Sequence, residues 1–477
     1  MIPGKIIETI IVMAYFLTML FFGWRGRKQS AESYWIAERR YSATRITISL
    51  VATIFGASST IGIIGLGYAR GLTGAWWSLM GGIALIPFAL FLASRVRASN
   101  AYTLPDILKK AYGEKVSMPA GIVIAVAWCG VIAAQLVAGG RLVAGLFSVD
   151  FQVALFAVAV VFTAYTFWGG QLSVIRTDFW QFMFFGAGFL IALAFLLLSL
   201  SSTPVPWWKN IPVGHWRFPV SSSFGWYDVL VYYPLIVGLP YLVGPDIYSR
   251  VLCAKSGQAA KKAALNAAVI VMPLSFLLAL FGLLARAKFH GIPADAALPK
   301  VLAACIPTGL KGLVAVGFLS AIMSSADTCL ISASTILALN VFRPVYGGNT
   351  GQYLKVTRWG VVLLGTISWL IASQEQGIIS SLLLGYTVFV GGIVMPILGT
   401  FFQERLRITP KAAFWAVIIG GGTAIAGKVS GGLAMKTLLT GHGQVFLREV
   451  LGPQYMSIFP ILLSVSVLLL ISRINRT

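Results

Sequence analysis

The sequence predicts an all-α membrane protein with thirteen transmembrane helices. Of its 477 residues, 58% are hydrophobic and only 10% are charged, and the mean hydropathy is +0.86. Soluble proteins carry about 25% charged residues, so this composition excludes an ordinary soluble protein. Apolar stretches of about 20 residues, long enough to cross a bilayer as helices, recur along the whole chain.

We expect the spans to follow one another with short connections. The connections at 201–224, 288–311 and 429–452 are the longest, and none is long enough to form a separate soluble domain. We therefore predict a single polytopic membrane domain over residues 1–477. The expected spans are 5–24, 46–69, 75–96, 117–147, 151–170, 177–200, 225–249, 263–287, 312–341, 355–374, 378–402, 412–428 and 454–472.

The formal net charge of +22 reflects membrane topology rather than nucleic-acid binding. Most Lys and Arg residues, for example Arg25, Arg39, Lys110, Arg250 and Arg405, fall in alternate connections on one side. Cytoplasmic connections of membrane proteins are enriched in Lys and Arg. We expect the chain in the cytoplasmic (inner) membrane, with its N-terminus outside and its C-terminus in the cytoplasm. The expected partners are the lipid bilayer and a small solute, without nucleic acid, and the chain is expected to function as a monomer.

Residues typical of enzymes and metal centres are not grouped along the chain. The four cysteines are scattered, and neither a CxxC pair nor a His cluster is present. No nucleophile elbow and no paired His/Glu motif occurs. We therefore expect neither enzymatic activity nor a zinc site or disulfide framework.

The second and seventh spans contain clusters of helix-breaking residues. The second has four glycines around the polar run 57–60, and the seventh has three prolines and two glycines between Pro234 and Pro245. Unwound backbone at membrane depth is tolerated only where it is buried in protein or lines a cavity. The alternative for the second span is a continuous helix whose glycines permit close packing. Since the two spans lie five apart, we predict an inverted five-plus-five repeat (46–200 and 225–402), with flanking helices at 5–24, 412–428 and 454–472.

The ninth span, within Gly317–Asn340, carries small and hydroxylated residues on one face. Ala321, Ser324, Ser325 and Thr328 are three or four residues apart, so they share a side of the helix. Asp327 lies beside them, and a carboxylate at bilayer depth needs a partner, an ion or water. This combination favours an ion site over simple close packing of small residues.

Several motifs, in this order and spacing, resemble the sodium/solute symporter family, which includes bacterial proline, pantothenate and sodium/galactose transporters. The resemblance covers nearly the whole chain. It implies thirteen spans, the inverted-repeat (LeuT-like) fold and uptake of a small organic solute driven by the sodium gradient. The motifs are SYWIAERR (33–40), GASSTIG (56–62), YTLPDILKKAYG (102–113), QLVAGGRL (135–142), RTDFWQ (176–181), GPDIYSRVLCAKS (244–256) and GFLSAIMSSADTCLISAST (317–335).

The resemblance implies a sodium site between the second and ninth spans. Ala57, Thr60 and Ala321 would contribute carbonyl oxygens, while Ser324 and Ser325 would contribute hydroxyls. This chemistry is sensible, because sodium is a hard cation and carbonyl oxygens can replace its hydration shell.

The resemblance also implies a second cation position at Asp178, Asp327 and Thr328. Asp327 stands where a hydroxyl residue is commoner, so a proton could replace sodium as the coupling ion. For Asp178 the alternative is an N-cap at the start of the sixth span.

The expected solute site surrounds the two breaks. The resemblance places Tyr241 at an aromatic gate and implies a cavity lined by Ser58, Ser59, Ile61, Gly62, Gln135 and Gly238. Ile63, Val131 and Val237 replace aromatics found in proline-specific members, which argues against proline. Few amides and charged groups are available for a sugar, so we expect a small amino acid or carboxylate.

Two other functions remain open from the sequence. The same fold could couple uptake to protons through Asp327 and Asp178. A transporter-like sensor that binds a solute without moving it is the other alternative.

Overall fold

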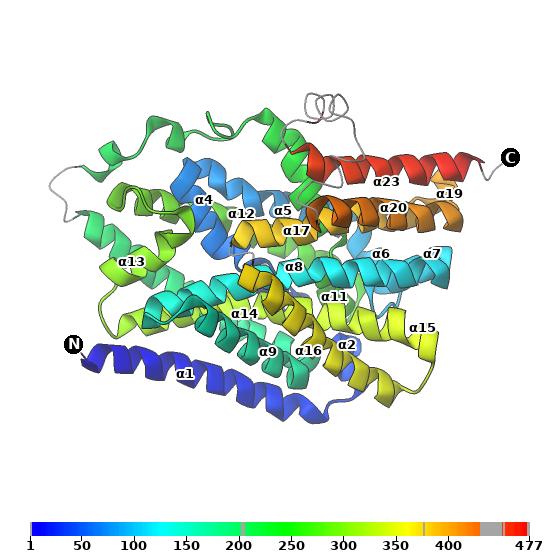
Figure 1. The fold of residues 1–477 in the computed structure, drawn as a ribbon, viewed down its shortest axis with the longest axis horizontal. Helices are drawn as coiled ribbons and strands as arrows, with labels where there is room; N and C mark the ends of the chain where they lie inside the picture. Colours follow the sequence, from blue (N-terminus) through cyan, green and yellow to red (C-terminus); the bar gives the residue numbers. More distant parts are fainter. Residues whose placement is uncertain (1, 202–205, 375–376, 430–450, 452–453, 475–477) are drawn as a thin grey trace.

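A computed structural model of the chain describes residues 2–201, 206–374, 377–429, 451 and 454–474. These residues are helical almost throughout, and no strand occurs among them (Figure 1). The predicted connection at 429–452 lies almost entirely outside the described residues. Ten of the described helices are long and apolar enough to cross a membrane. The fold class predicted from the sequence, an all-α membrane protein, is confirmed.

The helices vary from one turn to more than ten turns. Short 3-10 or π turns join several of them, at Gly26–Lys28, Ala37–Arg39, Ser58–Gly62, Gly71–Ala75, Phe88–Leu92, Trp207–Asn210, Val213–Trp216, Asp228–Tyr232, Pro234–Gly238, Ala294–Ala296, Leu337–Phe342 and Val390–Val394. The α-helices are α1 (Ile2–Arg25), α2 (Ala31–Ile36), α3 (Ala43–Ile54), α4 (Ile63–Arg70), α5 (Trp76–Pro87), α6 (Ala93–Ala98), α7 (Leu104–Tyr112), α8 (Glu114–Phe147), α9 (Phe151–Ser201), α10 (Leu239–Val243), α11 (Pro245–Leu252), α12 (Gly257–Lys288), α13 (Ala297–Cys305), α14 (Leu310–Ile336), α15 (Arg343–Tyr346), α16 (Thr350–Gln374), α17 (Ile378–Phe389), α18 (Met395–Phe401), α19 (Gln403–Leu406), α20 (Pro410–Val429) and α23 (Tyr455–Ile474).

The predicted count of thirteen spans differs from the ten long apolar helices for identifiable reasons. The expected spans 151–170 and 177–200 form one helix, α9, with a kink at Gly170 (φ +59°). The expected span 46–69 is divided between the short α3 and a helical stretch that continues to Ala98. The expected span 412–428 corresponds to α20, which is not counted among the ten long apolar helices. The number thirteen therefore stays a prediction.

Both predicted helix breaks are present. The first separates α3 from the turn at Ser58–Gly62, because Phe55 leaves the helical conformation with ψ +50°. The second separates α10 from α11, where Gly244 is extended (φ −62°, ψ +135°). The structure thus excludes a continuous second span. The other glycines of that span are helical, and Gly65 and Gly67 pack closely against Ala294 and Ala279.

Helix α14 forms the centre of the bundle. It lies between α1 at one edge and α20 and α23 at the opposite edge (Figure 1). All its residues from Val314 to Ile336 are buried. Small residues permit this close packing: a Cβ atom on Gly317 would lie 2.7 Å from the carbonyl oxygen of Phe184 in α9. The polar residues of α14 therefore face other helices rather than lipid.

Candidate functional site: the crossing of the first helix break and α14

The unwound backbone at residues 55–57 lies directly against α14 and α8. A Cβ atom on Gly56 would lie 2.5 Å from the Ser325 hydroxyl oxygen and 2.7 Å from the Gln135 amide oxygen. Only a glycine can therefore occupy position 56 while these two side chains keep their places. The break that the sequence predicted is in this way brought onto the hydroxyl-bearing face of α14.

Polar groups at the break are partly satisfied by nearby side chains and backbone. The Ala57 backbone N–H donates to Oε1 of Gln135 at 2.7 Å, which replaces the helix hydrogen bond lost at the break. The Thr60 hydroxyl donates to the Gly56 carbonyl oxygen at 2.7 Å. The Ala57 carbonyl accepts from the Gly62 N–H at 2.9 Å. The Thr60 hydroxyl also lies 3.5 Å from the Ala57 oxygen, so a cation bound to this oxygen would take the place of that long contact.

The α14 residues of the expected sodium site are all buried. Ala321, Ser324 and Ser325 are between 0% and 5% exposed. Ser325 faces Gly56, whereas Ser324 donates its hydroxyl to Oδ1 of Asp178 in α9 at 2.7 Å. The structure thus places the two serines between the first break and a buried carboxylate.

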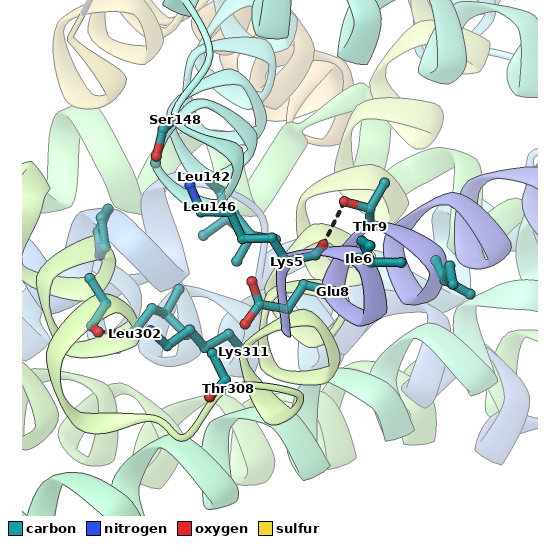
Figure 2. A pocket seen from close by; sticks show the side chains of 14 residues that line it. Lys5, Ile6, Glu8, Thr9, Leu142, Leu146, Ser148, Leu302, Thr308 and Lys311 are labelled. Carbon is teal, nitrogen blue, oxygen red and sulfur yellow. Dashed lines mark hydrogen bonds between the residues drawn. The ribbon is translucent and has the colours of Figure 1, made fainter. Parts of the chain in front are cut away.

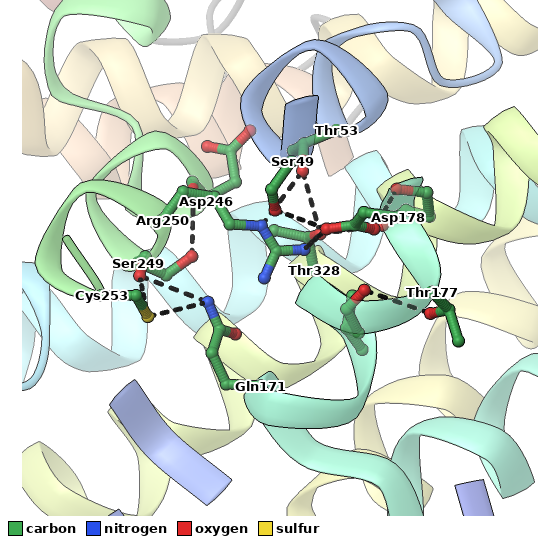
Figure 3. Close-up of polar contacts among 12 residues, drawn as sticks. Ser49, Thr53, Gln171, Thr177, Asp178, Asp246, Ser249, Arg250, Cys253 and Thr328 are labelled. Carbon is green, nitrogen blue, oxygen red and sulfur yellow. Dashed lines mark hydrogen bonds and ion pairs between the residues drawn. The ribbon is translucent and has the colours of Figure 1, made fainter. Parts of the chain in front are cut away.

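Asp178 belongs to a buried ion pair that joins four helices (Figure 3). Its Oδ2 atom lies 3.4 Å from the Arg250 guanidinium, and both side chains are fully buried. Oδ2 also accepts from the Ser49 hydroxyl. The interpretation of Asp178 as an N-cap is wrong, because α9 continues through this residue without ending.

Arg250 connects the second break to α14. Its guanidinium donates to the hydroxyls of Thr328 in α14 and Thr53 in α3. The two threonine hydroxyls are themselves 3.2 Å apart. A cation therefore already occupies the region between Asp178 and Thr328, and this cation is a side chain. The sequence-based assignment of Arg250 to a cytoplasmic connection is wrong, since the residue is 0% exposed within the bundle.

Asp327 points in a different direction from Thr328. Its Oδ1 atom accepts from the Thr166 hydroxyl of α9 at 2.7 Å. Its Oδ2 atom has no hydrogen-bond partner among the described residues, although the side chain is fully buried. The three residues predicted to form a second cation position thus divide into Asp178 with Thr328 at Arg250, and Asp327 at Thr166.

A small cavity lies between the two breaks, α8, α14 and α17. Its accessible volume is about 20 Å³, enough for one water molecule, so binding of an organic solute requires its walls to separate. Four of the predicted solute residues line it, together with Ser325: Ser58, Ser59, Gln135 and Tyr241. The other three, Ile61, Gly62 and Gly238, are buried but are not among its lining residues. Gly62 faces Ile379 instead, and Gly238 faces Met80.

The sequence analysis missed a carboxylate in the wall of this cavity. Asp246 lies in the first turn of α11, two residues after the extended Gly244. None of the ion pairs found among the described residues includes it. Asp246 and Arg250 are four residues apart within an apolar segment, which places them on one helix face. Two charged residues on one face of an apolar helix could have indicated a functional site from the sequence.

Comparison with known families shows which family contains a chain with these two broken helices. Residues 34–420 match the model of the sodium:solute symporter family. The chain belongs to this family. The symporter therefore shares the sodium-coupled transport of small solutes that characterises the family, and its matched relatives are transporters rather than enzymes.

Curated relatives cover most of the symporter at low identity. It is 26% identical over 474 residues to the human sodium/myo-inositol cotransporter 2, covering 88% of this chain and 68% of the relative. It is 24% identical over 438 residues to the sodium/glucose cotransporter of Vibrio parahaemolyticus, covering 83% and 79%. The Bacillus subtilis osmoregulated proline transporter OpuE is 24% identical over 452 residues, covering 90% of each chain.

Solved structures show the fold of the symporter. A Na⁺-coupled sialic acid symporter in a substrate-bound outward-open state superposes with a TM-score of 0.76 at 16% identity, covering 96% of this chain and 97% of the other. MhsT in complex with L-phenylalanine gives a TM-score of 0.53 at 15% identity, covering 91% and 99%. These structures confirm the LeuT-like fold predicted from the sequence. The match to the sodium:solute symporter family confirms sodium as the coupling ion.

Proposed function

We propose that this symporter takes up a small solute bearing an amino group, such as an amino acid, together with sodium. The observation that carries the proposal is Asp246, a partly buried carboxylate that lines the cavity beside Ser58 and Ser59. A carboxylate that becomes enclosed when a solute binds is stable when it is paired with a positive charge. An ammonium group of the solute supplies that charge, whereas a simple carboxylate would be repelled.

The solute would lie between the two broken helices. Ser58, Ser59 and Gln135 offer hydroxyl and amide groups to the cavity, and Tyr241 offers an aromatic ring. A solute carboxylate near the second half of the first broken helix would meet the positive end of its dipole. Ile61, Gly62 and Gly238 would join the lining once the walls separate, and Tyr241 would serve as the inner gate.

Sodium would bind where the first break crosses α14. The ligands are the carbonyl oxygens of Ala57, Thr60 and Ala321 and the hydroxyls of Ser324 and Ser325. The contact of Gly56 with Ser325 supports this site, because it brings the break and the serine face together. Bound sodium would hold the two elements together, and its release would let them separate. The sodium affinity of a Ser324→Ala/Ser325→Ala variant tests these ligands.

We assign the second cation position to two alternating occupants. In this conformation the Arg250 guanidinium neutralises Asp178 and contacts Thr328. When α11 moves away, a second sodium ion would replace the Arg250 guanidinium beside Asp178 and Thr328. Asp327 would then not bind this ion directly, because its carboxylate is hydrogen-bonded to Thr166 in α9. The family match makes sodium the coupling ion, in place of a proton at Asp327 and Asp178. Uptake that follows a pH gradient in the absence of sodium, and is lost in Asp327→Asn, would contradict this assignment.

The expected orientation has the N-terminus outside and the C-terminus in the cytoplasm of the inner membrane. The start of α1 and the end of α23 lie at opposite ends of the bundle, which supports an odd number of crossings (Figure 1). The proposed unit is one domain, with repeats at about 46–200 and 225–402, working as a monomer.

Replacing Asp246 tests the solute class. We expect Asp246→Asn to weaken uptake of the amino solute by at least about tenfold, because removing one member of a buried charge pair costs about 2–5 kcal/mol. The measurement is sodium-driven uptake into proteoliposomes, with labelled alanine, glycine and proline each compared with the matching acid that lacks the amine. Glu114→Gln, which removes an exposed carboxylate paired with Lys109, is the matched control.

Two outcomes would contradict the assignment of an amino solute. One is uptake of the amine-free acids as fast as the amino acids, and the other is unchanged amino-acid uptake by Asp246→Asn. Sodium dependence would remain intact in both cases, so the solute class and the coupling ion are tested separately.

A further inference from the structure

Another cavity, much larger than the one between the helix breaks, lies where α1 begins, α8 ends and α14 begins (Figure 2). Its volume is about 760 Å³, within the range of about 300–1,000 Å³ typical of ligand sites. Its floor is apolar, with Leu142, Leu146 and Leu302. The cavity therefore has the size and lining to hold a partly apolar molecule.

Glu8 is the unusual residue of this cavity. Its side chain is 3% exposed, and its Oε1 atom has no hydrogen-bond partner among the described residues. None of the ion pairs found in the described part of the chain includes it. Figure 2 shows its carboxylate in the middle of the lining side chains, between Lys5 and Lys311. Packing does not explain why this position carries a carboxylate, since a buried unpaired polar atom is costly.

The cavity carries both signs of charge together with an apolar wall. Lys5 and Lys311 line it beside Glu8, and Lys311 also donates to the Ala303 carbonyl oxygen at 2.9 Å. Ile6 and Ile10 of α1 line the same cavity and are 51% and 61% exposed. On a membrane-spanning helix, exposed isoleucines contact acyl chains, so the cavity opens toward lipid. A ligand that complements it needs an ammonium group, an anionic group and an apolar tail.

We propose that this cavity binds phosphatidylethanolamine. The lipid ammonium group donates hydrogen bonds to the Glu8 carboxylate, and its phosphate lies near the Lys5 and Lys311 ammonium groups. The glycerol end and the first acyl carbons cover the apolar floor and the exposed isoleucines. A quaternary choline headgroup has no N–H donor for Glu8, so the site distinguishes the two lipids.

The test compares lipid binding to the full-length chain in detergent by native mass spectrometry. We expect about fivefold tighter binding of phosphatidylethanolamine than of phosphatidylcholine, and equal binding of both by Glu8→Gln, because the charge-assisted hydrogen bond is then lost. Glu32→Gln removes an exposed carboxylate outside the cavity and should keep the preference. Gly145→Phe should also abolish it, since a Cβ atom there meets only Pro299, at 3.7 Å, and the ring fills the cavity without altering Glu8. If Glu8→Gln does not fold, Gly145→Phe decides the result.

Four results would overturn the lipid site. The first is equal binding of the two lipids by the unmodified chain. The second is an undiminished preference in Glu8→Gln or Gly145→Phe. The third is competition by free phosphoethanolamine as strong as that by the intact lipid, which would indicate a site for a soluble zwitterion. Tighter binding of phosphatidylglycerol that does not depend on Glu8 would equally exclude the proposal, because lysines alone would then select the lipid.

Discussion

Gly56→Ala is expected to raise the sodium concentration needed for half-maximal uptake by at least about tenfold, which corresponds to about 1.4 kcal/mol or more lost from sodium binding. The added methyl group would lie 2.5 Å from the Ser325 hydroxyl and 2.7 Å from the Gln135 amide oxygen, so one of these groups must move. Movement of Ser325 displaces a proposed sodium ligand, and movement of Gln135 leaves the Ala57 N–H without its acceptor. The measurement is the initial rate of uptake as a function of external sodium.

The matched control for this substitution is Gly186→Ala in α9. A Cβ atom at that position meets nothing within 4 Å, so the same chemical change should leave uptake unaffected. If Gly56→Ala retained the sodium dependence of the unmodified protein, close contact between the first break and α14 would not be needed for coupling.

Removing one member of the Asp178–Arg250 pair is expected to lower the free energy of unfolding by about 3–5 kcal/mol, because the remaining charge is left buried without a partner. Asp178→Asn and Arg250→Met should therefore both reduce thermal stability in detergent. The double variant Asp178→Asn/Arg250→Met should regain much of the stability, since no unpaired charge remains. It should still lack normal sodium coupling, because Ser324 loses its carboxylate partner.

The exposed pair Arg40–Glu38 provides the control for this double-mutant cycle. Its side chains are 47% and 41% exposed, so its removal should change stability by only about 0–1 kcal/mol. Equal stability losses in the buried and exposed cycles, or a double variant less stable than both single variants, would show that Asp178 and Arg250 do not act as a pair.

The sequence predicted those parts of the structure that depend on local residue type. Glycines and prolines indicated both helix breaks, and hydrophobicity indicated the spans. The sequence did not indicate which of the three prolines and two glycines of the seventh span would interrupt the helix. Pro234 and Gly238 lie in a π turn, so the chain stays helical at both positions. Only Gly244 adopts an extended conformation there.

Contacts between residues on different helices could not be predicted from the sequence, because they depend on how the helices pack. Asp178 and Arg250 are 72 positions apart, and their 3.4 Å contact depends on how α9 and α11 pack. Gln135 was expected at the cavity, but its hydrogen bond to the Ala57 N–H depends on where the first helix unwinds. The division of Asp327 and Thr328 between different partners likewise follows from the rotation of α14 relative to α9 and α11.

The most direct test of the sodium site is a sodium titration of the Ser324→Ala/Ser325→Ala variant, with Ser332→Ala in the same helix as the control. We predict that the double variant needs at least about tenfold more sodium for half-maximal uptake, because two of the five ligands are lost. Ser332→Ala should titrate like the unmodified protein, since its hydroxyl donates to the Cys329 carbonyl oxygen of its own helix. An unchanged half-saturating sodium concentration in the double variant would contradict a sodium site between the first helix break and α14.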